Sequence, residues 1–448
     1  MRAAISIALL GAVVTVAPLT AQGGPSTLNF SFSNPGARSL GMGGAFAALA
    51  DDATAAFSNP AGLIQLSRPE VSVEGRYWEY SSPFTVSGRV SGEATGIGLD
   101  TSLRAAESEF DTSALSFLSF VYPARNWTLA LSQHQLAKFE FNTATQGLFT
   151  DDPVDGPQPT CLPGTVVCRY PEFRRNTRIE MATTTLSVAL RGSDKFSMGL
   201  GLSYHQADLR LSAEQYTLAE ETLPLGFFGP NDYAPGALYG RDSFESDDTD
   251  WAFNLGFLWF ISRQWSLGGF YRSAPEAGLD GERRSGPALD PPIPTGTLAG
   301  SVSDVTFHFP EVYGLGLAYR SRNGSWTAGF EWDRVQYSTI LESIPDNDLI
   351  TVDYVFIDDA DELRLGGEYA FRQLQPIVAL RAGLWKDPDH QVRTTEDDPL
   401  EQALLPRGTD ELHYSLGVGV AFKNFQTDIA LDLSDQVNTA AISLIYAF

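Results

Sequence analysis

The chain has 448 residues, with 30 Lys and Arg against 55 Asp and Glu, and its formal charge is therefore −25. This acidic balance excludes a nucleic-acid binder that relies on an overall basic field. Charged residues make up 19% of the chain, below the roughly 25% usual in soluble domains. The mean hydropathy of −0.11 argues against a helical membrane bundle, and after the N-terminus no apolar run is long enough for a transmembrane helix.

The N-terminal residues have the pattern of a secretory signal peptide. Met1 and Arg2 form a short positive region, residues 3–17 are apolar, and a small-residue cleavage site ends at Ala21. The alternative is a buried N-terminal helix, but the polar, Gly-rich sequence from Gln22 onward favours export. We therefore expect residues 1–21 to be a signal peptide and the mature protein to leave the cytoplasm.

The only cysteines, Cys161 and Cys168, flank a Pro-Gly turn. In an oxidising compartment this arrangement predicts one disulfide that closes a short loop. Because no His and no third Cys lies nearby in the sequence, we expect no metal site here.

From Pro69 onward, apolar residues recur at every second position, which predicts β-strands with one apolar face. The segment from Leu412 to Phe422 is the clearest example, because its apolar residues alternate with small or polar ones. In a soluble sandwich the apolar face points into a core, whereas in a membrane barrel it points outward to lipid. The periodicity alone does not choose between the two.

The connections between these segments favour the membrane barrel. Short polar turns alternate with long loops, as in outer-membrane barrels, and the count gives about 14 strands with both ends of the barrel on the short-turn side. The short turns are expected near 123–126, 192–194, 262–264, 321–324, 372–375 and 423–424. The long loops are expected near 81–109, 142–174, 215–243, 274–303, 338–350 and 386–409.

Aromatic residues support this interpretation, since Trp and Tyr prefer the membrane interface. One predicted girdle lies beside the short turns and contains Trp127, Trp265 and Trp326. A second girdle at the opposite ends of the strands would contain Trp251, Trp332, Trp385 and Tyr414. We therefore predict an all-β fold, a transmembrane antiparallel β-barrel formed by residues 69–448.

Strand parity predicts a set of side chains that face the lumen: His205, Glu331, Asp333, Arg364, Glu368, Arg381 and His413. Arg364 or Arg381 could bind the carboxylate of a fatty acid, but ion pairs with Glu or Asp in the lumen are an open alternative. Phe227 and Phe228, in a long loop, could form an apolar landing surface for a ligand or could only anchor the loop.

Residues 22–68 lack the alternation of the strands and are rich in Gly and Ala. A 14-stranded barrel would leave a hole if nothing filled it, so this compact segment is predicted to be a plug with short helices inside the lumen.

Within this segment, residues 36–63 resemble the hatch of FadL/TodX-type outer-membrane transporters for hydrophobic compounds, most clearly at Asn59-Pro60-Ala61. The terminal Phe448 resembles the C-terminal residue that barrel-assembly machinery recognises. The resemblance implies a 14-strand barrel with an N-terminal hatch in the outer membrane of a Gram-negative-type bacterium. The long loops would then be extracellular and both termini periplasmic. We expect a monomer that contacts outer-membrane lipid.

The same resemblance implies uptake of long-chain fatty acids or other hydrophobic compounds through a hatch-plugged lumen, with possible lateral release through the wall. The residues proposed for hatch gating are Gly41, Gly43, Gly44, Asn59, Pro60, Ala61 and Gly62. The alternative is that they only shape a static plug.

Two other functions remain to be weighed. PorV proteins of an outer-membrane secretion system carry comparable N-terminal segments, so an accessory or scaffold role is an alternative that predicts co-purification with a partner protein. A lipid-modifying enzyme is less favoured, because the five histidines occur in no recognisable nucleophile motif. We expect no enzymatic activity, no cofactor and no nucleic-acid partner.

Overall fold

The structure is a computed structural model, and it describes residues 33–90, 103–145, 148–150, 160–161, 168–170, 173–218, 235–285, 298–342, 355–395, 397 and 399–448. Within these residues, fourteen strands pair antiparallel in a closed ring, which confirms the predicted fold class. The ring closes where β1 pairs with β21, with Glu70 opposite Ala447. In ring order the strands are β1 (Glu70–Arg89), β2 (Arg104–Pro123), β3 (Trp127–Thr145), β7 (Phe173–Ser193), β8 (Phe196–Leu218), β9 (Pro235–Phe260), β10 (Trp265–Arg272), β13 (Val312–Arg320), β14 (Trp326–Val335), β16 (Ala360–Phe371), β17 (Ile377–Asp387), β19 (Glu411–Ala421), β20 (Phe425–Leu433) and β21 (Val437–Ala447).

Shorter elements lie inside the ring or extend it. The hairpin of β11 (Glu276–Ser285) and β12 (Leu298–His308) continues the wall beside β9. The remaining strands are β4 (Leu148–Thr150), β5 (Thr160–Cys161), β6 (Cys168–Tyr170), β15 (Val355–Phe356) and β18 (Arg393–Thr394). The helices are α1 (Ala37–Leu40), α2 (Ala55–Ser58), the 3-10 helix η1 (Pro60–Gln65), α3 (Thr339–Glu342) and α4 (Pro399–Leu404). No helix in the described part of the chain is long and apolar enough to cross a membrane.

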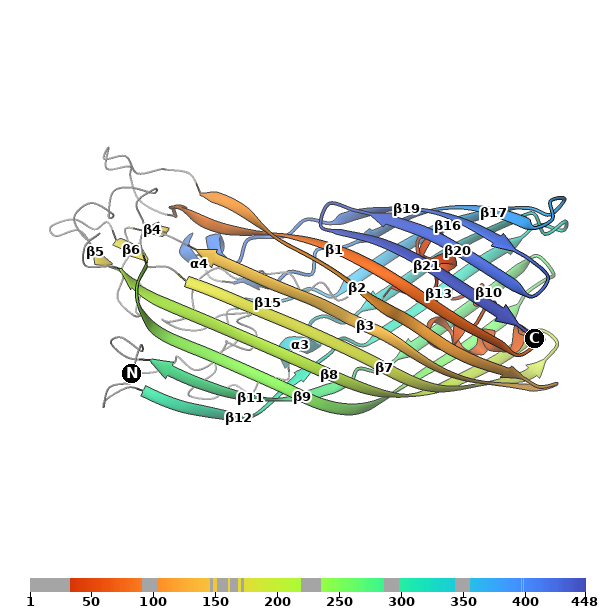
Figure 1. The fold of residues 1–448 in the computed structure, drawn as a ribbon, viewed down its shortest axis with the longest axis horizontal. Helices are drawn as coiled ribbons and strands as arrows, with labels where there is room; N and C mark the ends of the chain where they lie inside the picture. The colour runs from red at the N-terminus through yellow and green to blue at the C-terminus, as the bar shows by residue number, and fades with distance from the viewer. Residues whose placement is uncertain are drawn as a thin grey trace.

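The strands differ in length around the ring. Figure 1 shows β7, β8 and β9 extending far beyond the ends of β19, β20 and β21 at the end opposite the C-terminus. Several segments expected to be long loops are therefore partly strand, since β1 continues to Arg89, β8 continues to Leu218, and β11 and β12 occupy much of 274–303. These segments remain strands because neighbouring strands pair with them beyond the apolar band.

The outer surface of the barrel is apolar and its inner surface is polar. On β20, Ile429 and Leu431 are 49% and 46% exposed, whereas Ala430 between them and the flanking Asp428 and Asp432 are buried. The seven side chains predicted to face the lumen are all buried, which confirms the assignment of strand faces. A sheet with this pattern is stable only when lipid covers its outer face.

The predicted aromatic girdle beside the short turns is confirmed, because Trp127, Trp265 and Trp326 are exposed on the outer surface. The prediction that Trp385 belongs to the second aromatic girdle was wrong. This residue alternates with the exposed Leu384, lies inside the barrel, and stacks on His413 with ring centroids 3.8 Å apart. The alternation of side chains along β17, rather than the position of Trp385 near the end of the strand, determines that its side chain points into the lumen.

Along β8 the outer face changes from apolar to charged and the inner face changes from polar to apolar. Near the short turn, Leu200 and Leu202 face outward and Ser203 faces the lumen. Further out on the same strand, Asp208 and Arg210 form an exposed ion pair on the outer face, while Leu209 and Leu211 are buried inside.

The same reversal occurs on β7, where Leu186 and Leu190 face outward near the turn, and Ile179 and Met181 are buried inside further out. The wall is therefore a membrane barrel at one end and a water-exposed barrel with an apolar interior at the other.

Substitution along β8 tests this boundary. Leu200→Arg places a charge in the lipid-facing band and should destabilise the folded barrel by about 2–4 kcal/mol, whereas Gln206→Arg on the same face should cost only about 0–1 kcal/mol. Equilibrium unfolding in lipid vesicles measures both. Equal effects for the two variants would contradict the proposed membrane boundary.

Candidate functional site

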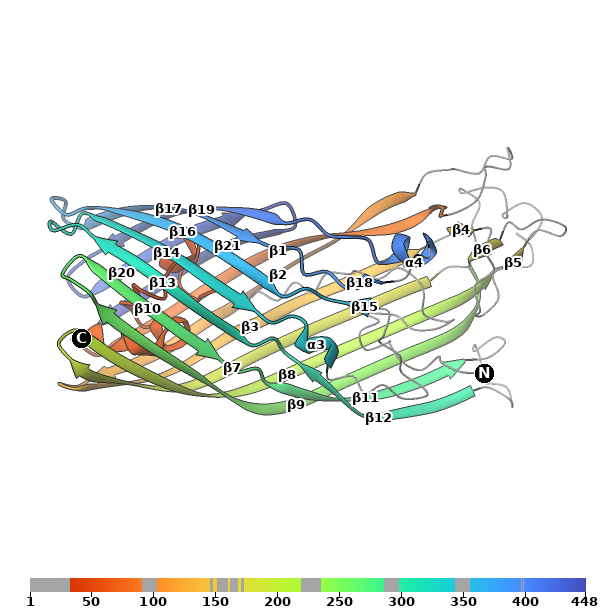
Figure 2. The ribbon, with the colours of Figure 1, turned by 180° about the vertical axis from the view of Figure 1, so that it is seen from behind.

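The described N-terminal residues 33–66, here called the hatch, lie inside the barrel near the end that carries the C-terminus (Figures 1 and 2). Local sequence determines its short turns. Gly43 and Gly44 have φ angles of 63° and 76°, which glycine adopts without strain. Asp52 accepts a hydrogen bond from the Thr54 N–H at 2.9 Å just before α2 begins. The predicted boundary at residue 22 lies outside the described residues.

The hatch backbone rests directly on glycines of the barrel wall. On eight consecutive strands, a lumen-facing glycine lies where an added Cβ would come within 3.2 Å of a hatch atom. Any larger side chain at these positions would push the hatch off the wall. We call this set the glycine belt: Gly199, Gly256, Gly268, Gly316, Gly329, Gly366, Gly383 and Gly417.

Polar wall side chains next to the belt hold the hatch through its carbonyl groups. Ser266 donates to the Ala48 carbonyl at 2.7 Å, and Ser197 donates to the Ala61 carbonyl at 3.0 Å. Asn254 donates to the Ala56 carbonyl, also at 3.0 Å. These bonds supply partners for backbone groups that neither a regular helix nor a sheet satisfies.

Buried ion pairs attach the other side of the hatch. Arg38 contacts Asp51 at 2.6 Å within the hatch and Glu368 of β16 at 3.0 Å. Glu368 also contacts Arg381 of β17 at 2.7 Å, and Arg381 contacts Asp428 of β20 at the same distance. Removing one partner of such a buried chain would leave an uncompensated charge, so the chain resists displacement of the hatch.

Asn59 joins the hatch to itself and to the wall. Its side-chain amide donates to the Ala47 carbonyl at 2.8 Å and to the Phe257 carbonyl of β9 at 2.9 Å. Its Oδ1 accepts from the Ala61 N–H at 3.1 Å and so caps η1, which starts at Pro60.

The residues predicted for gating thus lie at contacts that shape the hatch. Asn59, Pro60 and Ala61 touch the wall at Gly199 or Gly256, while Gly41 and Gly43 touch it at Gly417 and Gly383. Gly44 lies against Arg364, and Gly62 packs against Ala50 within the hatch. Whether these residues move remains a prediction.

A largely apolar pocket lies beside the hatch, with some polar residues in its lining. Phe57 of the hatch forms part of its lining, together with Leu136 of β3, Ala252 of β9 and Val312 of β13. Arg272 at the end of β10 also lines it and is 9% exposed. We call this space the Arg272 pocket.

Arg272 differs in its surroundings from Arg364 and Arg381, the arginines proposed from the sequence. Its guanidinium lies 4.2 Å from the ring centroid of Phe57 and 4.4 Å from that of Phe270. Among the described residues, none accepts a hydrogen bond from its Nε or Nη1. A buried guanidinium with unused donors beside an apolar cavity is suited to bind an anion that carries an apolar group. Sequence reasoning missed this residue, although the parity of β10 from Ser266 would place it in the lumen.

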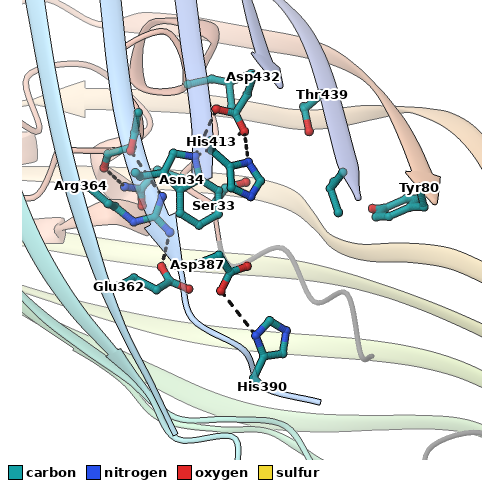
Figure 3. A pocket seen from close by; sticks show the side chains of 15 residues that line it. Ser33, Asn34, Tyr80, Glu362, Arg364, Asp387, His390, His413, Asp432 and Thr439 are labelled. Atoms are coloured by element: carbon teal, nitrogen blue, oxygen red, sulfur yellow. Dashed lines mark hydrogen bonds and ion pairs between the residues drawn. The ribbon is translucent and has the colours of Figure 1, made fainter. Parts of the chain in front are cut away.

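Arg364 and Arg381, the arginines proposed from sequence, are both ion-paired. Arg364 contacts Asp333 at 3.1 Å and also pairs with Glu362. It lines a second pocket with His390, His413, Asp387 and Asp432, whose side chains converge on it in Figure 3. Its charged side chains, unlike Arg272, are paired with one another.

Four segments pack into the outer part of the lumen. Residues 336–342, 355–358, 388–395 and 399–405, here called the lid, place Tyr337, Ile340, Val392 and Leu405 in the apolar core of the barrel extension. Figure 2 shows α3, β15, β18 and α4 of this lid within the outer part of the barrel. Burial opposes protonation of His390, but attraction by Asp387 outweighs it and raises the pKa of His390 to about 9.

The backbone ladder between β2 and β3 stops part of the way along the two strands, and this interruption is here called the slit; further out, hydrogen bonds of the Lys138 and Ser108 side chains bridge the two strands. The ladder begins at the pair of Pro123 and Thr128 and ends at the pair of Phe117 and His134. Beyond this level β2 is still paired with β1, and β3 is still paired with β7. A bulge between Gln135 and Ala137 begins at this level, and Leu136 there turns into the Arg272 pocket. The slit therefore begins beside the apolar cavity.

Other predicted residues lie away from this site. The backbone pairing of β5 with β6 places Cys161 opposite Cys168, and their disulfide remains a prediction. Phe227 and Phe228 lie outside the described residues. The described residues contain no group of three or more His, Cys, Asp or Glu side chains that could hold a metal ion.

Comparison with known proteins adds a family and a fold. The sequence profile described as "Outer membrane protein transport protein (OMPP1/FadL/TodX)" matches residues 170–439. The fold is similar to the CymD monoaromatic hydrocarbon channel and to a Pseudomonas aeruginosa FadL homologue, each at 15% identity and a TM-score of 0.59, covering 94% of this chain and 99% and 100% of theirs. The Pseudomonas putida toluene transporter TodX matches at 15% identity and a TM-score of 0.56, covering 93% and 99%. No curated protein sequence matches the chain.

The glycine belt can be tested at two adjacent positions. In Gly366→Ala the new methyl group would overlap the Met42 carbonyl of the hatch, whereas at the outward-facing Gly367 the nearest atom is the Thr327 carbonyl oxygen at 3.9 Å. We expect Gly366→Ala to destabilise the protein by about 1–3 kcal/mol and to expose the hatch to protease, with Gly367→Ala close to wild type. Thermal unfolding measures the stability of both variants, and limited proteolysis measures the exposure of the hatch. A Gly366→Ala variant as stable and as protease-resistant as the wild type would contradict the contact between Gly366 and the hatch.

The role of Asn59 can be tested by Asn59→Ala. The substitution removes the side-chain donor to the Ala47 and Phe257 carbonyl groups, which should cost about 1–3 kcal/mol and loosen the hatch. We expect increased ion leakage in planar bilayer recordings. Wild-type conductance together with wild-type stability would show that Asn59 does not hold the hatch.

Proposed function

Because the chain belongs to the outer membrane protein transport protein family (OMPP1/FadL/TodX), we propose that it takes up apolar compounds that carry a carboxylate, long-chain fatty acids among them. The family consists of outer-membrane transport proteins rather than enzymes. What remains to be proposed is the ligand, its route and the orientation of the barrel.

The observation that carries the choice of ligand is the environment of Arg272. A pure hydrocarbon would fill the apolar cavity but would leave the buried guanidinium without an acceptor, which is unfavourable in a site of low polarity. A carboxylate would pair with the unused donors, while its apolar tail would lie against Phe57, Leu136 and Val312. Arg364 and Arg381, the two arginines proposed from the sequence, already have carboxylate partners in the lumen.

The route follows the reversal of polarity along the wall. In this proposal the extended strands point away from the cell, and the short turns face the periplasm. An apolar ligand would enter the apolar interior of the extension by displacing the lid and would then descend to the Arg272 pocket. It would leave sideways through the slit between β2 and β3, because this path enters lipid without crossing water. The hatch would then remain in the barrel during transport.

Ligand binding tests the proposal. Wild-type protein should bind dodecanoate more tightly than dodecanol, because only the acid pairs with Arg272. Arg272→Met should weaken dodecanoate binding by about 1.5–3 kcal/mol, roughly 10- to 100-fold, and leave dodecanol binding unchanged. Calorimetry on the detergent-solubilised protein measures these affinities. Equal affinity for acid and alcohol in the wild type would contradict the choice of ligand.

A further inference from the structure

At the end of the barrel that carries the C-terminus, every hairpin turn contains one basic residue. Six turns join neighbouring strands there, between β2 and β3, β7 and β8, β9 and β10, β13 and β14, β16 and β17, and β19 and β20 (Figure 1). All six basic side chains are exposed, and Asp194 is the only acidic residue in these turns. We call the six side chains the turn cations: Arg125, Lys195, Arg263, Arg322, Arg372 and Lys423. They concentrate positive charge at one end of a chain whose formal charge is −25.

The turn cations differ from the exposed cations of the water-exposed extension, which have acidic partners. On the outer face of β8, Arg210 pairs with Asp208 at 3.3 Å. On β7, Arg178 pairs with Glu180 at 2.8 Å. Among the described residues, no such ion pair involves a turn cation, and Arg372 donates to a backbone carbonyl instead. The positive charge of the short-turn end is therefore left for anions outside the chain to balance.

The turn cations lie next to the aromatic girdle, at the level of lipid headgroups. Three of them precede an outward-facing aromatic residue by two positions. Two residues of strand span about 7 Å, close to the depth of the headgroup layer on one side of a bilayer. With the aromatic ring at the membrane interface, the basic side chain reaches the lipid phosphates. The pairs with this spacing are Arg125 and Trp127, Arg263 and Trp265, and Lys423 and Phe425.

The distribution of the turn cations around the ring favours a membrane over a protein partner. They occupy six successive hairpins, and Arg68 lies beside the seventh junction, where β1 and β21 close the ring. A protein that docks on one side of the barrel would need the cations gathered on that side. A bilayer surrounds the barrel and meets all of them at the same depth.

We propose that the turn cations bind the headgroups of anionic phospholipids in the leaflet that the short turns reach. Phosphatidylglycerol has the required chemistry, because its phosphate carries a net negative charge, whereas the phosphate of phosphatidylcholine is balanced by the choline of the same headgroup. Each basic side chain at an anionic surface adds to the attraction. The ring of contacts holds the aromatic girdle at the membrane surface. This inference is independent of the transported ligand and of the Arg272 pocket.

Lipid selectivity of the full-length protein in phosphatidylcholine vesicles tests the proposal. Increasing fractions of dibrominated phosphatidylglycerol or dibrominated phosphatidylcholine quench the fluorescence of outward-facing tryptophans such as Trp127, Trp265 and Trp326, and the two curves give a relative binding constant. We expect the wild type to prefer phosphatidylglycerol roughly twofold to fivefold at low salt. The preference should disappear in about 1 M NaCl, where screening is strong. Equal quenching by the two lipids at low salt would overturn the proposal and would point to a soluble acidic partner.

Two matched variants locate the preference on the barrel. The first neutralises four turn cations and should lose the preference: Arg125→Gln, Arg263→Gln, Arg322→Gln and Lys423→Gln. The second removes the same amount of charge from the water-exposed end and should keep the preference: Arg178→Gln, Arg210→Gln, Arg241→Gln and Lys386→Gln. A preference that survives in the first variant, or is lost only in the second, would contradict the assignment.

Smaller substitutions keep the test decisive if the fourfold turn variant fails to fold. Each of its four single substitutions should reduce the preference in part. A combined Arg125→Lys, Arg263→Lys and Arg322→Lys variant keeps the positive charge and should retain the wild-type preference. If the single substitutions leave the preference unchanged, or the Lys variant loses it, charge at the turns does not select the lipid and the proposal is wrong.

Discussion

The reversal of polarity along the strands is the constraint on which the rest of the structure depends. Near the short turns, leucines cover the outside and serines and charges face the lumen; further out, charges cover the outside and apolar side chains fill the interior. Neither arrangement is stable in the other medium, because lipid cannot solvate the charges and water cannot solvate the exposed leucines. The reversal therefore fixes the position of the barrel in the membrane and creates an apolar interior that an apolar ligand can enter from the water-exposed end.

Below that interior, the polar lumen of the membrane section can hold a hatch. A plug of small residues has little apolar surface to bury, so its attachment depends on backbone contacts with the glycine belt, on hydrogen bonds such as Ser266 to Ala48, and on buried ion pairs through Arg38. Each of these contacts requires the hatch to be in register with the wall. The Arg272 pocket lies where this polar section meets the apolar interior, which is why one unpaired cation and an apolar lining occur together there.

The sequence predicted the strand faces and the hatch because both depend on local chemistry. Alternation along one strand is sufficient to place Glu331 and Arg364 in the lumen. The same alternation places Trp385 in the lumen, whereas its position near the end of the strand suggested the outer aromatic girdle. The glycine belt, the slit and the role of Arg272 depend on which strands become neighbours and where a ladder stops. Alternation places Gly366 in the lumen and Gly367 on the outer face, but only the fold shows that Gly366 touches the hatch backbone. Likewise, Arg272 and Arg381 both alternate into the lumen, and only the fold determines that Arg381 has carboxylate partners.

Site-directed spin labelling along the outer face of β8 tests the reversal most directly. Labels at positions 198, 200 and 202 should be accessible to oxygen dissolved in lipid, and labels at 208, 210 and 212 should be accessible to a water-soluble nickel complex. The account predicts a single crossover between residues 202 and 208. Uniform accessibility along the strand, or a crossover in the opposite direction, would contradict it.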